Sequence, residues 1–85
     1  SDSSDQLAAG ATSIATGTGQ LATGTKDLDD GLAKLEAAMA AAPTGTPVSA
    51  FLPTVTKLAT GADTLNTKTQ GAATQVSGYA TLSGN

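Results

Sequence analysis

Large aliphatic side chains recur every seven residues along the first half of the chain, and glycine recurs with the same period three residues later. The aliphatic positions are Leu7, Ile14, Leu21, Leu28 and Leu35, and the glycine positions are Gly10, Gly17, Gly24 and Gly31. A seven-residue period with two inward-facing positions is typical of a coiled coil, here with leucine at position a and glycine at position d. Because "LAKLEAAMAAA" continues this phase with strong helix formers, the pattern predicts one helix over about residues 4–42.

The second half of the chain carries the same period more weakly. Phe51, Leu58, Leu65 and Tyr79 continue the series of large side chains, two of them aromatic, and Gly61 occupies a glycine position. A cluster of helix-breaking residues, "PTGTP" at 43–47, separates the halves. Proline suits the first turn of a helix, so the second helix is expected to begin at 47 or at 53 and to end near 83. The tip would then span residues 43–52.

Glycine is costly inside a helix, and this cost has to be offset by packing. The five glycines at 10, 17, 19, 24 and 31 together cost about 4–5 kcal/mol relative to alanine. A row of positions without side chains lets a second helix approach closely or accommodates a bulky side chain opposite. We therefore predict an all-α fold, an antiparallel two-helix coiled-coil hairpin, which could also bundle as a dimer or extend into a longer stalk.

Two registers satisfy this large-to-small packing. The first pairs Gly31 with Leu58, Gly24 with Leu65 and Gly10 with Tyr79. The second pairs Gly31 with Leu65, Leu35 with Gly61 and Gly17 with Tyr79. A tight turn at 43–46 favours the first register, whereas a loop that reaches residue 53 favours the second.

Composition argues against several functions. The 85 residues carry four lysines and seven acidic residues, a net charge of −3, with no histidine and no cysteine. This balance disfavours binding to nucleic acid, which needs basic patches that displace counterions. A segment of this size with so few large apolar side chains is expected to be part of a larger protein.

Candidate chemistry is sparse. The carboxylate cluster "DLDDG" at 27–31 does not have the spacing of a calcium loop, so we expect no metal site and no cofactor. The lysines are scattered at solvent-facing positions, and Asp30 with Lys34 is the expected ion pair on an exposed helix face. Without His or Cys a nucleophile would lack its usual base, so we expect no enzyme activity and no catalytic residue.

The tip is the one place where apolar side chains are dense. Val48, Phe51, Leu52 and Val55 gather there. They are expected to cap the open end of the hairpin, or alternatively to form a contact site for a protein partner.

The L-x-x-G repeat with Ala, Thr and Ser between, as in "QLATGTKDLDDGLAKL" and "KLATGADTL", resembles the extracytoplasmic stalk of the YhgE/Pip (phage infection protein) family. Members of that family place a long helical region outside the cell between transmembrane helices, and they include a phage receptor and a relative in type VII secretion. The resemblance implies a fragment of the ectodomain of a bacterial membrane protein, on the extracellular face of the membrane. It brings no catalytic motif.

The leading hypothesis is therefore a non-enzymatic structural and interaction segment of a membrane-anchored surface protein. It would pack against itself or against neighbouring helices of the parent protein, with a possible partner at the tip. Two alternatives stay open: an extracellular hairpin of an MmpL-like transporter, and an ice-binding helix rich in threonine and alanine. Thr16, Thr23, Thr60 and Thr67 recur every seven residues, a spacing that drifts around a straight helix and so disfavours the second alternative.

Overall fold

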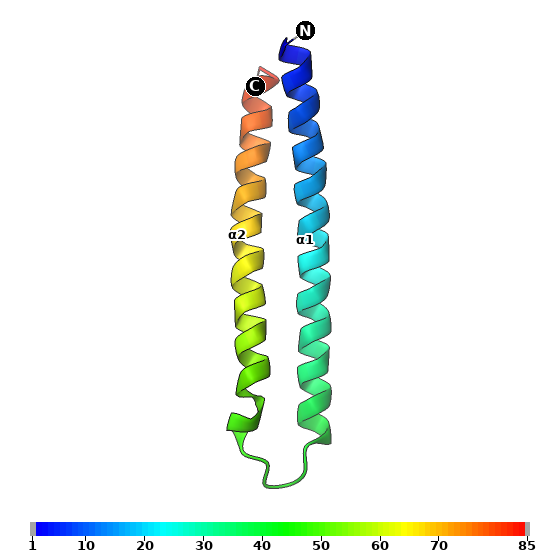
Figure 1. Cartoon of the computed structure of the whole chain (residues 1–85), viewed down its shortest axis with the longest axis vertical. Coiled ribbons are helices and arrows are strands. Elements are labelled where there is room, and N and C mark those ends of the chain that lie inside the picture. The colour runs from blue at the N-terminus through cyan, green and yellow to red at the C-terminus, as the bar shows by residue number, and fades with distance from the viewer. Residues whose placement is uncertain (1, 85) are drawn as a thin grey trace.

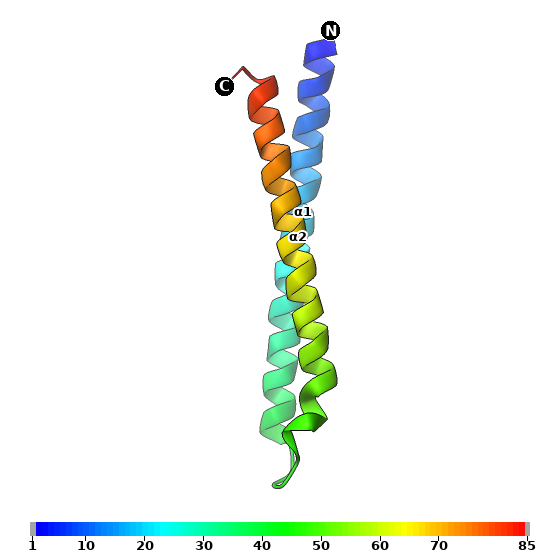
Figure 2. The same ribbon diagram turned by 90° about the vertical axis from the view of Figure 1, so that its left-hand side faces the viewer.

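The structure, a computed structural model, describes residues 2–84 as two long helices joined at one end (Figure 1). Helix α1 spans Asp2–Ala41, a 3₁₀ turn η1 spans Val48–Phe51, and α2 spans Leu52–Leu82. The helices run antiparallel, side by side, and form a rod of 67 × 16 × 14 Å. In Figure 2 the two ribbons cross at a shallow angle, as in a coiled coil. The predicted all-helical, antiparallel two-helix hairpin is confirmed.

The helix boundaries lie within two residues of the predicted 4–42 and of the later predicted range, 53–83. The first helix spans Asp2–Ala41, where the sequence predicted about residues 4–42. The second long helix begins at Leu52, one residue before the later of the two predicted starts. Pro47, at φ −70°, precedes η1, and Pro53 lies in the first turn of α2, where its missing N–H has no helical acceptor to lose.

A tight turn closes the hairpin at residues 43–46. The Thr46 N–H donates to the Pro43 carbonyl at 3.1 Å, and the Thr46 hydroxyl donates to the same oxygen at 2.7 Å. Gly45 has φ +90°, as the third residue of a type II turn requires, and glycine reaches that conformation without steric cost. The turn is therefore short enough to permit the first of the two predicted registers.

That first register is the one observed. A Cβ built on Gly31 would lie 2.5 Å from Leu58 Cδ2, and one built on Gly24 would lie 3.0 Å from Leu65 Cδ1. A Cβ on Gly10 would lie 3.3 Å from Tyr79 Cδ2. Each step of seven residues along α1 thus matches a step of seven back along α2, and we call this row of pairs the seam.

The predicted packing residues line the seam on both helices. The side chains of Leu7, Ile14, Leu21, Leu28, Leu35, Leu58, Leu65 and Tyr79 are all half-buried, and so are the four heptad-spaced glycines of α1, Gly10, Gly17, Gly24 and Gly31, whereas Gly19 is exposed. We call each such set of facing residues a level of the seam. At the remaining level, that of Gly17, the facing side chains of α2 are Gln75 and Ala72. The glycines of α1 therefore let large side chains of α2 sink close to its backbone, which offsets their low helix propensity.

Gly61 does not behave as predicted. It is exposed, and no atom lies within 4 Å of the position its Cβ would take. The prediction that it packs inside the hairpin is therefore wrong. In the observed register Gly61 lies at the level of Leu28, whose side chain points into the space between the helices but does not come within 4 Å of the Gly61 Cβ position, so both residues line an open space there.

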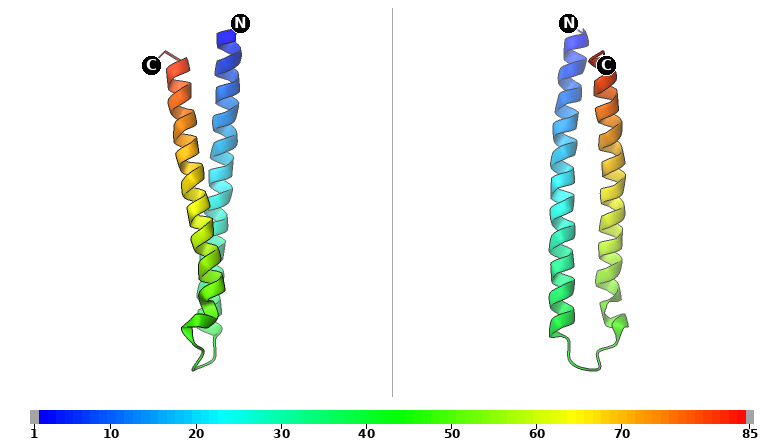
Figure 3. Two further views of the ribbon diagram at one scale, coloured as in Figure 1. Left: turned by 60° about the vertical axis from the view of Figure 1, so that its left-hand side comes forward. Right: turned by 180° about the vertical axis from the view of Figure 1, so that it is seen from behind.

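The rod is too thin to enclose a core. Among residues 2–84, none is fully buried, and the seam leucines keep part of their surface exposed. Two helices cover each other on one stripe only, so each broad side of the hairpin stays open (Figure 3). What those two sides carry decides what the hairpin can bind.

Candidate interaction surfaces

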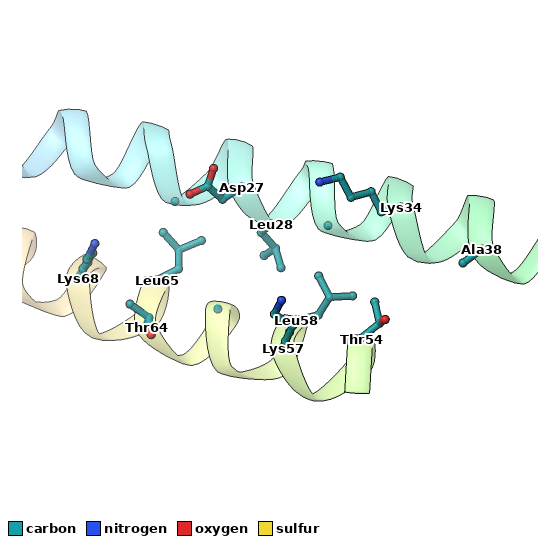
Figure 4. A pocket seen from close by; sticks show the side chains of 13 residues that line it. Asp27, Leu28, Lys34, Ala38, Thr54, Lys57, Leu58, Thr64, Leu65 and Lys68 are labelled. Carbon is teal, nitrogen blue, oxygen red and sulfur yellow. The ribbon is translucent and has the colours of Figure 1, made fainter. Parts of the chain in front are cut away.

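One broad side of the hairpin holds a groove of about 650 Å³ between α1 and α2 (Figure 4). Its floor is apolar: Leu28, Leu58 and Leu65 point into the space between the helices. We define the groove by its lining residues, which are Gly24, Asp27, Leu28, Gly31, Lys34, Ala38, Thr54, Lys57, Leu58, Gly61, Thr64, Leu65 and Lys68. The open space at Gly61 is part of this groove.

The charge of the groove is opposite to that of the whole chain. Lys34, Lys57 and Lys68, three of the four lysines, line it together with a single carboxylate, Asp27. Within residues 2–84, the one ion pair joins the remaining lysine, Lys26, to Asp30 at 2.8 Å. The groove therefore combines an apolar floor with a rim that is positive on balance.

That ion pair corrects a prediction. Asp30 pairs with the lysine four residues before it, not with Lys34 four residues after it. Both spacings place the charges on one helix face. Lys34 instead lies beside the seam and lines the groove.

The opposite broad side carries the large apolar residues that the seam leaves out. Leu32 and Met39 on α1, and Leu52 and Val55 on α2, are between 44% and 56% exposed. A helix turns about 100° per residue, so Met39 lies 40° to one side of the seam residue Leu35, whereas Lys34 lies 100° to the other side. The groove lining accordingly includes none of these four residues. We call the four residues the ridge.

The ridge lies near the tip and has an acidic border. Counting along both helices from the Gly31–Leu58 pair, Val55 lies level with Lys34, and Leu32 lies level with Lys57. Asp29 and Glu36 follow on the outer edge of the same side of α1, about two turns apart. The ridge and the tip-proximal half of the groove thus occupy the same stretch of the rod on opposite sides.

The predicted tip residues do not form a single plug. Phe51 is half-buried at the end of the seam, consistent with a cap on the hairpin. Val48 is 81% exposed, and Leu52 and Val55 belong to the ridge. The structure therefore divides the four predicted residues into one packing residue and three exposed ones.

Sequence reasoning missed both the groove and the ridge. The available signal was the pair of heptad positions that flank the seam: in an antiparallel pair, the e positions of both helices share one side and the g positions share the other. Leu32, Met39 and Val55 occupy e positions, whereas Lys34 and Lys57 occupy g positions. When the two kinds of position are considered separately, the e positions identify the apolar side of the hairpin and the g positions identify the basic side.

Neither a metal-binding cluster nor a membrane-spanning helix occurs among the described residues. Among residues 2–84, no three acidic, His or Cys side chains come together in a way that could hold a metal ion. Neither helix combines the length and apolar character that crossing a bilayer demands. No protein-family model matches the chain, and neither a curated protein sequence nor a solved structure shows significant similarity to it.

Proposed function

We propose that the hairpin is a non-enzymatic structural arm of a bacterial membrane-anchored surface protein of the YhgE/Pip type. It holds its tip away from a base and offers its two broad sides to other helices. The start of α1 and the end of α2 lie together at one end of the rod, and the tip lies at the other (Figure 1).

The observation that carries the proposal is the shape of the rod. Its long dimension is 67 Å and the other two are 16 and 14 Å, so most of the chain separates the base from the tip. The seam repeats its packing at each level and therefore extends the arm without creating an enclosed cavity. Such a design suits spacing and docking better than catalysis, which needs a site that excludes water.

The placement at the cell surface is supported by the repeat. The L-x-x-G repeat that resembles the YhgE/Pip stalk is the same repeat that places glycine at each level of the seam. A surface arm also accounts for the threonine and serine cover of the outer helix faces. Several threonines donate their hydroxyl to the carbonyl four residues earlier, as Thr25 does to Leu21 at 2.8 Å.

Cysteine labelling of the parent protein in intact cells tests this proposal. The sequence has no cysteine, so Val48→Cys introduces a single thiol at the exposed tip, and Leu28→Cys introduces a matched thiol in the half-buried seam. A membrane-impermeant maleimide is expected to label Val48→Cys on intact cells, and faster than it labels Leu28→Cys. Labelling of Val48→Cys only after lysis would contradict the surface location.

A further inference from the structure

We propose that the hairpin stacks on further copies of itself front to back, with the ridge of one copy seated in the groove of the next and all copies pointing the same way. The ridge is Leu32, Met39, Leu52 and Val55. The proposal concerns surfaces within the hairpin and does not depend on where the parent protein resides.

The first argument is fit. Toward the tip end of the ridge, at the levels of Met39 and Leu52, the groove is lined by two small side chains, Ala38 and Thr54. The ridge presents four large aliphatic side chains over the same stretch of the rod. Without any shift along the rod axis, Met39 and Leu52 of one copy therefore face Ala38 and Thr54 of the next, and Leu32 and Val55 lie against the stems of Lys57 and Lys34, which favours copies in parallel orientation.

The second argument is charge. The groove carries Lys34 and Lys57 at the levels of the ridge, whereas the ridge is bordered by Asp29 and Glu36. In a parallel stack, Glu36 of one copy lies close to the level of Lys34 of the next, so carboxylates meet ammonium groups. Pairing ridge against ridge would instead bring acidic borders together, and pairing groove against groove would bring lysines together.

The third argument is area. A broad side of the rod measures 67 by 16 Å between Cα atoms, which exceeds the roughly 800 Å² per partner of a standard stable interface. None of the described residues is fully buried in the single hairpin. A stacked copy would bury the exposed ridge and the seam leucines that form the groove floor.

Complementation between two defective variants tests the proposal on the full 85-residue chain. The ridge variant carries Leu32→Ser and Met39→Ser, and the groove variant carries Lys34→Glu and Lys57→Glu. All four positions flank the seam, so far-UV circular dichroism is expected to show unchanged helix content. Should the ridge variant lose helix, the single change Val55→Ser on α2 replaces it.

Sedimentation velocity gives the readout. The wild-type chain is expected to form assemblies that grow with concentration, and each variant alone is expected to associate at least about tenfold more weakly. An equimolar mixture of the two is expected to form a dimer and nothing larger, because one intact ridge meets one intact groove. A wild-type chain that stays monomeric overturns the proposal. So does a groove variant that still dimerises alone, since that indicates ridge-to-ridge pairing, or a mixture that stays monomeric.

Discussion

Substitution of the glycine at one level of the seam tests whether that position must lack a side chain. In Gly31→Ala, the added Cβ would lie 2.5 Å from Leu58 Cδ2, whereas carbon atoms in contact are separated by about 3.5–4.0 Å. Leu58 must therefore turn out of the seam, or the helices must separate. Gly71→Ala is the matched control, because Gly71 is an exposed glycine in a helix with no atom within 4 Å of its Cβ position.

Both substitutions gain helix propensity, which raises the free energy of unfolding. Only Gly31→Ala also overpacks the seam, which lowers it. Alanine is favoured over glycine in a helix by about 1 kcal/mol, so Gly71→Ala is expected to raise the free energy of unfolding by that amount. At Gly31 the same gain is opposed by an overpacking cost of about 1–3 kcal/mol. We therefore expect Gly31→Ala to lower the free energy of unfolding by about 0–2 kcal/mol.

Urea denaturation followed by circular dichroism, at concentrations where the chain is monomeric, measures both effects. The variants are expected to differ by at least about 1 kcal/mol, or about 4–8 °C in Tm for a chain of this size. In a Leu58→Ala background the Leu58 side chain no longer lies where the Gly31 Cβ would be, so Gly31→Ala is expected to become stabilising. Equal stabilisation by Gly31→Ala and Gly71→Ala in the wild-type background would refute the reasoning.

Two further predictions concern the tip. Phe51→Ala should lower the free energy of unfolding by about 1–2 kcal/mol because Phe51 caps the seam, whereas Val48→Ala, at an 81% exposed position, should change it by less than about 0.5 kcal/mol. Thermal melts of both variants check this, and equal losses would contradict the assignment of Phe51 as the cap. Gly45→Ala should cost about 1–2 kcal/mol because φ +90° strains any L side chain, and Thr44→Ala in the same turn is its control. Urea denaturation compares the two, and a Gly45→Ala variant as stable as wild type would contradict the observed turn.

Much of the fold was predictable because the seam is formed by residues that recur every seven positions in the sequence. Leucine and glycine three residues apart, repeated every seven, define a stripe on α1, and a turn of four residues fixes which residues of α2 meet it. Both the hairpin and its register follow from these two features. The short turn decided between the two registers, since Thr46 bonds back to Pro43 and leaves no long loop.

The features that were missed depend on what lies beside the seam. Gly61 fits the repeat, but the Leu28 side chain at its level stays more than 4 Å from its Cβ position, and the repeat alone does not reveal that spacing. Lys26, not Lys34, pairs with Asp30, since Lys34 lies beside the seam on the groove side. The start of α2 depended on how two prolines share a 3₁₀ turn and a first helical turn, which propensity alone does not order.

The paired candidate surfaces could have been found only by treating the two flanks of the seam separately. A single hydrophobic period counts Leu32 and Met39 merely as additional apolar residues within a good helix. Only the antiparallel pairing brings them to the same side as Val55 and sets them opposite Lys34. This is a property of two helices together, and neither helix shows it alone.

The register of the seam is tested most directly by disulfide formation between engineered cysteines, in a chain that has none of its own. Gly24→Cys with Leu65→Cys should oxidise within one chain, because a Cβ at Gly24 would lie 3.0 Å from Leu65 Cδ1, which places the two residues opposite each other at one level of the seam. Gly31→Cys with Leu65→Cys should stay reduced, since a seven-residue shift displaces the helices by about 10 Å. Rapid oxidation of the second pair would contradict the packing of leucine against glycine at matched levels. Failure of both pairs to oxidise would contradict it as well.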